Sequence, residues 1–65
     1  MNDKVKWEYD IAYKWWYASK GTGKFAVKKV KNGWLTMRVP WFGNPEVIST
    51  HDTKSAAQSQ AERLM

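Results

Sequence analysis

The dipeptide Asn32-Gly33 separates two runs of apolar and basic residues, 24–31 and 34–39. Asn-Gly between such runs is typical of a β-hairpin, because a type I′ turn needs positive φ at both central residues and Asn and Gly tolerate it. If these two residues form the loop, Lys31 pairs with Trp34 and every further pair follows from that register. The sequence therefore predicts two antiparallel strands in a defined alignment.

This alignment gives the predicted hairpin two different faces, because directly paired residues share a face. One face is apolar apart from Lys28, and we expect it to face the core; it holds Ala26, Val30, Leu35, Met37 and Val39. The other face combines cations with aromatic rings and a hydroxyl group, and we expect it to face the solvent; it holds Phe25, Val27, Lys29, Lys31, Trp34, Thr36 and Arg38.

Residues 5–17 carry an aromatic or β-branched side chain at every odd position. This period of two predicts a single long first strand. Such a strand extends about 43 Å at ~3.3 Å per residue, whereas a helix over residues 54–65 covers only about 18 Å at ~1.5 Å per residue. Because one helix cannot cover that strand, we predict a homodimer that shares the aromatic stripe. A sharply bent or bulged strand that hides the rings within one chain is the alternative.

The connections are predicted from their turn residues. Residues 19–23 break the alternation and indicate a turn, and Pro40 and Pro45 bound a connection that cannot be a central strand. The segment 46–50 favours a short fourth strand.

A helix is predicted for the C-terminal segment. Thr53 is its expected N-cap, and good helix formers follow from Lys54, with Ala57, Ala61 and Leu64 as a narrow apolar stripe. We therefore predict one domain over residues 1–65 of the α+β class, in which a small antiparallel sheet of three to four strands carries one C-terminal helix on one face.

The residue inventory argues against several classes of protein. The chain has no Cys, and His51 is its one His, so disulfides, zinc sites, thiol chemistry and Ser-His-Asp catalysis are not expected. Residues 18–24 resemble part of a phosphate-binding loop, but Phe25 stands where a Ser or Thr would hold Mg²⁺. We therefore expect no enzyme, no cofactor, no metal and no small-molecule substrate. Because the sequence has no long apolar run, we also expect no membrane contact and a cytoplasmic location.

The positive charge of the chain is concentrated in its middle. The net charge is +5, and no acidic residue occurs between Asp10 and Glu46. Seven cations fall in that stretch: Lys14, Lys20, Lys24, Lys28, Lys29, Lys31 and Arg38. They form either a solvated surface or a site for the phosphates of a nucleic acid, and a shared face would distinguish the two.

The C-terminal half, from about Asn32, resembles the N-terminal arm-binding domains of phage and transposon integrases. The matching residues are Gly33-Trp34, Arg38-Val39, Thr53-Lys54 and the helix positions Ala57, Ala61 and Leu64. The resemblance implies a three-stranded sheet packed on one helix, with the sheet laid in the major groove of DNA. The β-β-β-α part of double-stranded RNA-binding domains is also similar, although of its helix-start lysine cluster only Lys54 is present. The aromatic first strand belongs to neither pattern.

These observations predict a small nucleic-acid-binding protein of phage or mobile-element type that binds duplex DNA through the solvent face of its hairpin. Arg38 and Thr36 are the expected base contacts, Trp34 stacks or packs on sugar, and the expected phosphate contacts are Lys29 and Lys31. Lys20 and Lys24 complete the predicted site. The alternative is a protein-interaction module, such as a small inhibitor of a host protein, that uses an exposed aromatic surface.

Overall fold

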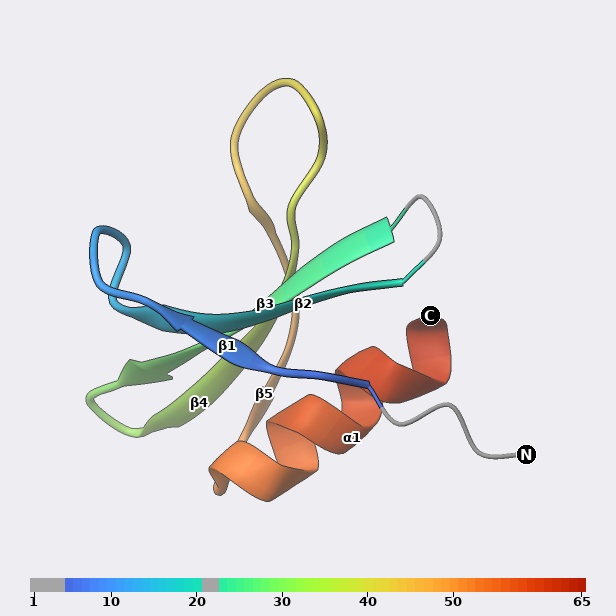
Figure 1. Ribbon diagram of the computed structural model, residues 1–65. Coiled ribbons are helices and arrows are strands. Elements are labelled where there is room, and N and C mark those ends of the chain that lie inside the picture. The colour runs from blue at the N-terminus through green and yellow to red at the C-terminus, as the bar shows by residue number, and fades with distance from the viewer. Residues whose placement is uncertain (1–4, 21–22) are drawn as a thin grey trace.

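The computed structural model describes residues 5–20 and 23–65. These residues form one antiparallel sheet in which five strands follow each other in chain order, and a C-terminal helix packs on it (Figure 1). The elements are β1 (Glu8–Asp10), β2 (Trp15–Lys20), β3 (Gly23–Val30), β4 (Gly33–Arg38), β5 (Glu46–His51) and α1 (Lys54–Leu64). The α+β class is confirmed, with five strands in place of the three to four that we predicted.

The prediction of a single long strand over residues 5–17 is wrong, because the chain reverses between β1 and β2. The Asp10 carboxylate accepts hydrogen bonds from the backbone N–H groups of Ala12 (2.9 Å) and Tyr13 (3.3 Å). The N–H of Lys14 closes the turn on the carbonyl of Asp10 at 2.7 Å, and Lys14 has φ 56°. Alternation continues on both sides of this turn, which is why periodicity alone did not reveal it.

The predicted turn over residues 19–23 includes residues 21 and 22, which lie outside the described residues. On either side of them Lys20 pairs with Gly23, so β2 and β3 run antiparallel as expected.

The β3–β4 hairpin forms, but its loop is Lys31-Asn32, because Val30 pairs with Gly33. Lys14 is the one non-glycine residue of the described chain with positive φ, so the predicted type I′ turn is wrong. Gly33 has φ 149°, and a Cβ there would clash with the carbonyl of His51 on β5. The register therefore differs by two residues from the predicted one, and an even shift leaves the composition of each face unchanged.

Helix α1 packs on the face that we expected to face the solvent, and this corrects the predicted core. The Thr36 hydroxyl donates to the carbonyl of Ala57 at 2.9 Å, and Val27 and Thr36 are fully buried. Ala57 and Ala61 are also fully buried, because their small side chains let the helix approach the sheet. The third residue of the predicted stripe, Leu64, is largely exposed.

Two side-chain contacts outside the β3–β4 hairpin also link α1 to the rest of the protein. The indole N–H of Trp7 donates to the Glu62 carboxylate at 2.9 Å. The Lys54 ammonium lies 3.6 Å from the ring centroid of Trp16, in a cation–π contact. At the start of the helix Thr53 is the predicted N-cap, and its hydroxyl accepts from the N–H of Ala56 at 3.1 Å.

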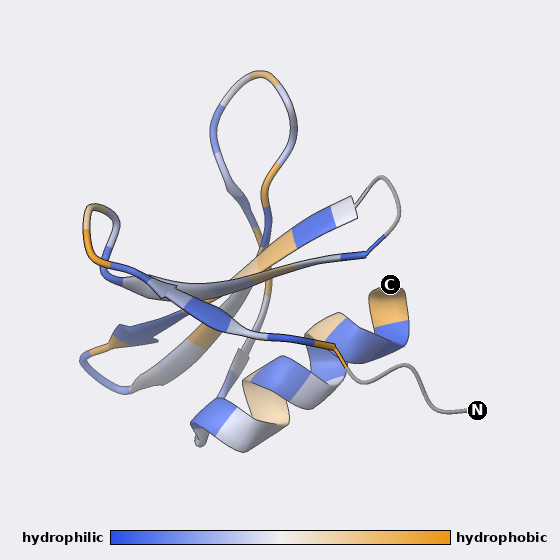
Figure 2. Ribbon diagram, viewed as in Figure 1, coloured by the Kyte–Doolittle hydropathy of each residue, from blue (hydrophilic) through white to orange (hydrophobic). Residues whose placement is uncertain are grey.

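The opposite side of the sheet has its own apolar cluster. Trp15, Ala26 and Met37 are buried there, and partly buried residues pack around them, namely Tyr17, Leu35 and Val39. In Figure 2, hydrophobic residues also colour the β1–β2 and β4–β5 loops, which rise on the side of the sheet away from α1 (Figure 1). Each face of the sheet is therefore apolar at its centre, and only one is covered by the helix.

Candidate nucleic-acid interface

The structure keeps Lys29, Trp34, Thr36 and Arg38 on one side of the sheet, but α1 covers the middle of that side. Thr36 lies under α1 with no exposed area, so it cannot contact a base. Trp34 is half-buried on the same side as Thr36, while Arg38 is exposed four residues further along β4, about 13 Å away at ~3.3 Å per residue.

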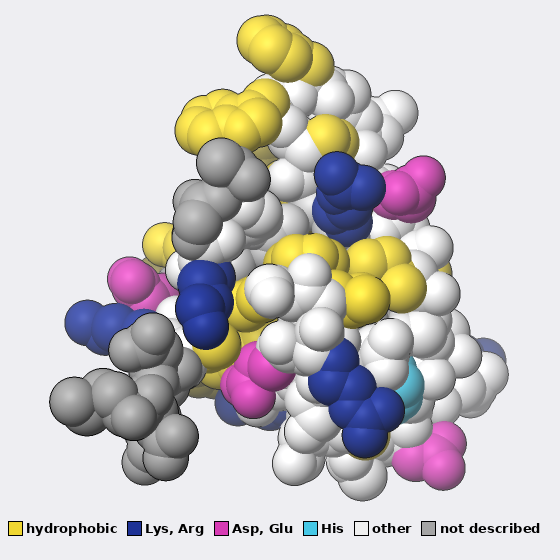
Figure 3. All heavy atoms as spheres, turned by 90° about the vertical axis from the view of Figure 1, so that its right-hand side faces the viewer, with side chains coloured by type: hydrophobic (Ala, Val, Ile, Leu, Met, Phe, Trp, Pro, Cys, Tyr) yellow, Lys and Arg dark blue, Asp and Glu magenta, His cyan; other side chains and the backbone are white. Residues whose placement is uncertain are grey.

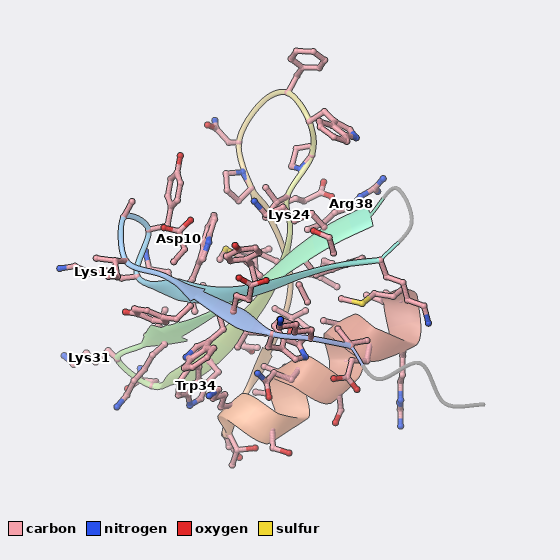
Figure 4. The ribbon with its side chains drawn as sticks, in the orientation of Figure 1. Asp10, Lys14, Lys24, Lys31, Trp34 and Arg38 are labelled. Atoms are coloured by element: carbon pink, nitrogen blue, oxygen red, sulfur yellow. The ribbon has the colours of Figure 1, made fainter. Side chains whose placement is uncertain are left out.

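The predicted lysines divide between the two ends of the sheet. Lys29 and Lys31 are exposed near the β3–β4 turn, whereas Lys24 and Lys20 belong to the β2–β3 hairpin at the opposite end. Figure 4 shows this separation, with Lys14 and Lys31 at one end and Lys24 and Arg38 at the other. The hairpin face is therefore not a continuous basic surface.

A better candidate lies on the side of the sheet opposite α1. The register places Tyr17 beside Ala26, and alternation along each strand brings Trp15, Lys24 and Lys28 to the same side. We call this surface, with Tyr13 from the β1–β2 loop, the helix-free face.

An aromatic stack is the central feature of the helix-free face. The rings of Tyr13 and Trp15 lie 4.7 Å apart between centroids, with 17° between their planes. Trp15 is 5% exposed and forms the base of the stack, whereas Tyr13 is 61% exposed. The turn closed by Asp10 presents Tyr13 in this position, so a short polar residue and one left-handed residue create the stack.

The Trp15 indole N–H is an unsatisfied donor beneath this stack. It is buried and has no hydrogen-bond partner within the part of the chain that the structure describes. An unpaired buried donor costs about 1–3 kcal/mol of stability.

Cations lie on the helix-free face and in the loops beside it. The Lys24 ammonium lies 4.7 Å from the centroid of the Tyr17 ring. Lys28 is exposed on the neighbouring part of β3, Lys14 follows Tyr13 in its loop, and Lys31 is exposed at the same end of the sheet. This combination of aromatic rings and ammonium groups suits a ligand that carries both flat apolar groups and negative charge.

Two carboxylates lie on the edge of the helix-free face, both on β1. Asp10 is engaged by the two N–H groups of its turn, and Glu8 is exposed opposite Tyr17. Because β1 is the edge strand, these charges border the stack on one side and leave the β3 side of it basic.

Tyr13 and Lys28 belong to this candidate site but were not among the binding residues predicted from the sequence. Lys28 carried a usable signal, because it is the one charge on a hairpin face that was otherwise predicted to be core. A lysine is almost never fully buried without a partner, so its presence there indicates that the face is open to solvent. Tyr13 carried the weaker signal of following an Asp that could close a turn.

Comparison with protein-family models, with curated proteins and with solved structures found no match to this chain. The resemblance to integrase arm-binding domains therefore stays a prediction. Over the described residues, no helix is long and apolar enough to cross a bilayer. The same residues contain no group of three or more His, Cys, Asp or Glu side chains that could hold a metal ion.

Proposed function

We propose that this protein binds single-stranded nucleic acid on its helix-free face. The observation that carries the proposal is the stack of Tyr13 on Trp15, whose outer ring is exposed; Lys14 follows Tyr13 in the chain, and Lys28 is exposed on the same side of the neighbouring strand. An unstacked base can extend such a stack, and base–aromatic stacking contributes about 1–3 kcal/mol per base. Lys14, Lys28 and Lys31 then lie where the phosphates of the strand pass.

Single strands fit this surface better than duplex DNA does. Stacking on Tyr13 requires a base with a free face, which a duplex offers only at its ends. The hairpin face that we expected to enter the major groove is covered by α1 at Thr36. A role for Arg38 and Lys29 in base or phosphate contacts on that side of the sheet is therefore not part of the proposal.

The test compares two tyrosines that differ in the face they occupy. Tyr13 is 61% exposed and packs on Trp15, and Tyr9 is 48% exposed and packs on Trp16 at 5.2 Å on the helix side. In fluorescence anisotropy titrations with a short single-stranded oligonucleotide, Tyr13→Ala should weaken binding roughly 5- to 150-fold. Tyr9→Ala should leave the affinity nearly unchanged, and equal losses in the two variants would contradict the proposal.

Charge provides a second matched pair. Lys28 and Lys29 are adjacent, both exposed, and lie on opposite sides of β3. Lys28→Glu should weaken binding and reduce the steepness of its salt dependence, because it removes a phosphate contact and adds a repulsive charge. Lys29→Glu changes the net charge equally, so a similar effect from both variants would show that the binding is a general property of the positive charge.

A protein partner is the second candidate function, and the observation that favours it is the exposure of Trp41 (86%) and Phe42 (92%) in the β4–β5 loop. Trp is among the residues that dominate binding energy at protein interfaces. Salt distinguishes the candidates, because an aromatic interface is nearly insensitive to it, whereas phosphate contacts weaken steeply as salt rises.

A further inference from the structure

The β4–β5 loop holds two large aromatic side chains away from the rest of the molecule. Trp41 and Phe42 are the most exposed large hydrophobic residues of the described chain, at 86% and 92%. Pro40 and Pro45 flank them, and each proline fixes φ at its own position on one side of the pair. Gly43 turns the chain with φ 93°, and a Cβ at this position would meet open space.

Folding does not account for this pair. Burying a Trp or a Phe typically stabilises a protein by a few kcal/mol. Because Trp41 and Phe42 are both exposed, neither contributes this stabilisation. A space-filling view shows hydrophobic side chains gathered at the tip of the molecule and Lys or Arg side chains below them (Figure 3). An Asp or Glu side chain lies beside the cation below the tip (Figure 3), so the exposed aromatic rings are the main feature of this end, and such rings suit a ligand with flat apolar groups.

The cations at the root of the loop are Lys24 and Arg38. The N–H of Val39 donates to the carbonyl of Lys24 at 2.9 Å, so the two strand ends are adjacent at this point. Arg38 is exposed and lies between Phe25 on β3 and the acidic Glu46 on β5. Figure 4 labels both residues at this end of the sheet, but the register puts Lys24 on the helix-free face and Arg38 on the helix side.

The loop also lies at the opposite end of the sheet from the Tyr13 stack. In an antiparallel sheet whose strands follow chain order, the β1–β2 and β4–β5 loops are at opposite ends. Both loops rise on the side away from α1 (Figure 1). A single-stranded nucleic acid that crosses the helix-free face from Tyr13 would therefore pass Lys24 before it reaches Trp41.

We propose that Trp41 and Phe42 form a second base-stacking site, so that the ligand is a single strand long enough to engage both ends of the sheet. This inference rests on the proposed function, because the first contact is the Tyr13 stack. Lys24, on the helix-free face, binds the phosphates that precede the second stacked base. Two linked contacts on one strand raise the affinity above that of either alone, because the second contact forms within the complex.

Strand length is the measurable consequence. Single-strand sites on OB folds, which are small β-barrels, cover about 4–16 nucleotides per fold. An oligothymidine near the lower length should occupy the Tyr13 stack alone, and one near the upper length should also reach the loop. The longer strand should bind roughly 5- to 150-fold more tightly than the shorter one, which is the gain from one further stacked base.

The test uses the double variant W41A/F42A, with N44A as its control in the same loop. Both changes replace exposed side chains, and circular dichroism with a thermal melt checks that the fold is retained. W41A/F42A should bind the short strand like the parent and lose the gain with length, whereas N44A should keep that gain. Tyr13→Ala should weaken binding of both strands.

The outcomes separate the two proposals. If the parent binds the short strand and W41A/F42A keeps the full gain with length, the second site is wrong and the proposed function stands. If the parent binds neither strand at low salt, the proposed function fails, and the second site fails with it. If Trp41 and Phe42 serve a protein or lipid partner instead, the gain with length is also unaffected in the double variant, and the second site is overturned.

Discussion

The backbone conformation of Lys14 helps to position the Tyr13 stack of the candidate site. Its φ of 56° lies in the left-handed region, where an L side chain costs roughly 1–2 kcal/mol relative to the right-handed helical region. The strain is retained because Asp10 closes the turn with three hydrogen bonds. The same turn presents Tyr13 to Trp15, so the stability given up at Lys14 maintains the stack.

Two substitutions at this position separate strain from charge. Lys14→Gly and Lys14→Ala both remove the ammonium group, but only Gly relieves the left-handed conformation. In urea titrations we expect Lys14→Gly to be more stable than Lys14→Ala by about 1 kcal/mol. Both variants should bind a single strand more weakly than the parent by a similar factor. Equal stabilities would show that the turn does not hold Lys14 in this conformation.

The position of the turn in the β3–β4 hairpin is determined by the neighbouring strand β5. Gly33 is required because β5 approaches its backbone so closely that a Cβ would clash with the His51 carbonyl. That contact involves a strand that ends 18 residues later in the chain, so the local Asn-Gly signal could not reveal it. The glycine serves the packing of β4 against β5, and the turn moves to Lys31-Asn32.

Gly33→Ala should therefore destabilise the protein strongly. The clash is with backbone, and the φ of 149° is unfavourable for an L residue, so we expect a loss of about 2 kcal/mol or more in the free energy of unfolding. Asn32→Ala is the matched control, because Asn32 is exposed in the loop and should lose less than about 0.5 kcal/mol. Similar losses in the two variants would favour the Asn32-Gly33 turn that the sequence predicts.

The elements themselves were largely predictable, and their arrangement was not. Thr53 as N-cap, the proline-bounded connection and the strand that begins at Glu46 follow from local chemistry, and the structure confirms them. The side on which α1 packs does not follow, because both faces of the hairpin are apolar at the centre. It depends on distant partners, such as the Thr36 hydroxyl and the carbonyl of Ala57. The candidate site moved to the other face for that reason.

For the whole molecule, the reversal at Asp10 removes the argument from length for a homodimer. The predicted strand of about 43 Å, at ~3.3 Å per residue, is two short strands, and its rings are divided between the two faces of the sheet. Trp15 and Tyr17 pack in the helix-free cluster, while Trp7 and Trp16 contact residues of α1. The homodimer stays a prediction, without the uncovered strand that motivated it.

The five tryptophans offer a direct test of which face binds, because they are distributed over both sides of the sheet. Trp15 lies in the helix-free face and Trp41 at the loop tip. The other three lie on the helix side, where Trp7 donates to Glu62, Trp16 lies under Lys54, and Trp34 shares its side of β4 with Thr36. Each indole N–H gives its own signal in a ¹⁵N-correlated NMR spectrum.

Titration of these indole signals with a single-stranded oligonucleotide shows which face of the sheet binds the ligand. A base stacked on Tyr13 changes the ring-current environment of Trp15, and a strand that reaches the loop changes that of Trp41. We expect the signals of Trp15 and Trp41 to move while those of Trp7, Trp16 and Trp34 stay in place. Movement confined to the three helix-side signals would rule out binding on the helix-free face and assign the ligand to the opposite face of the sheet.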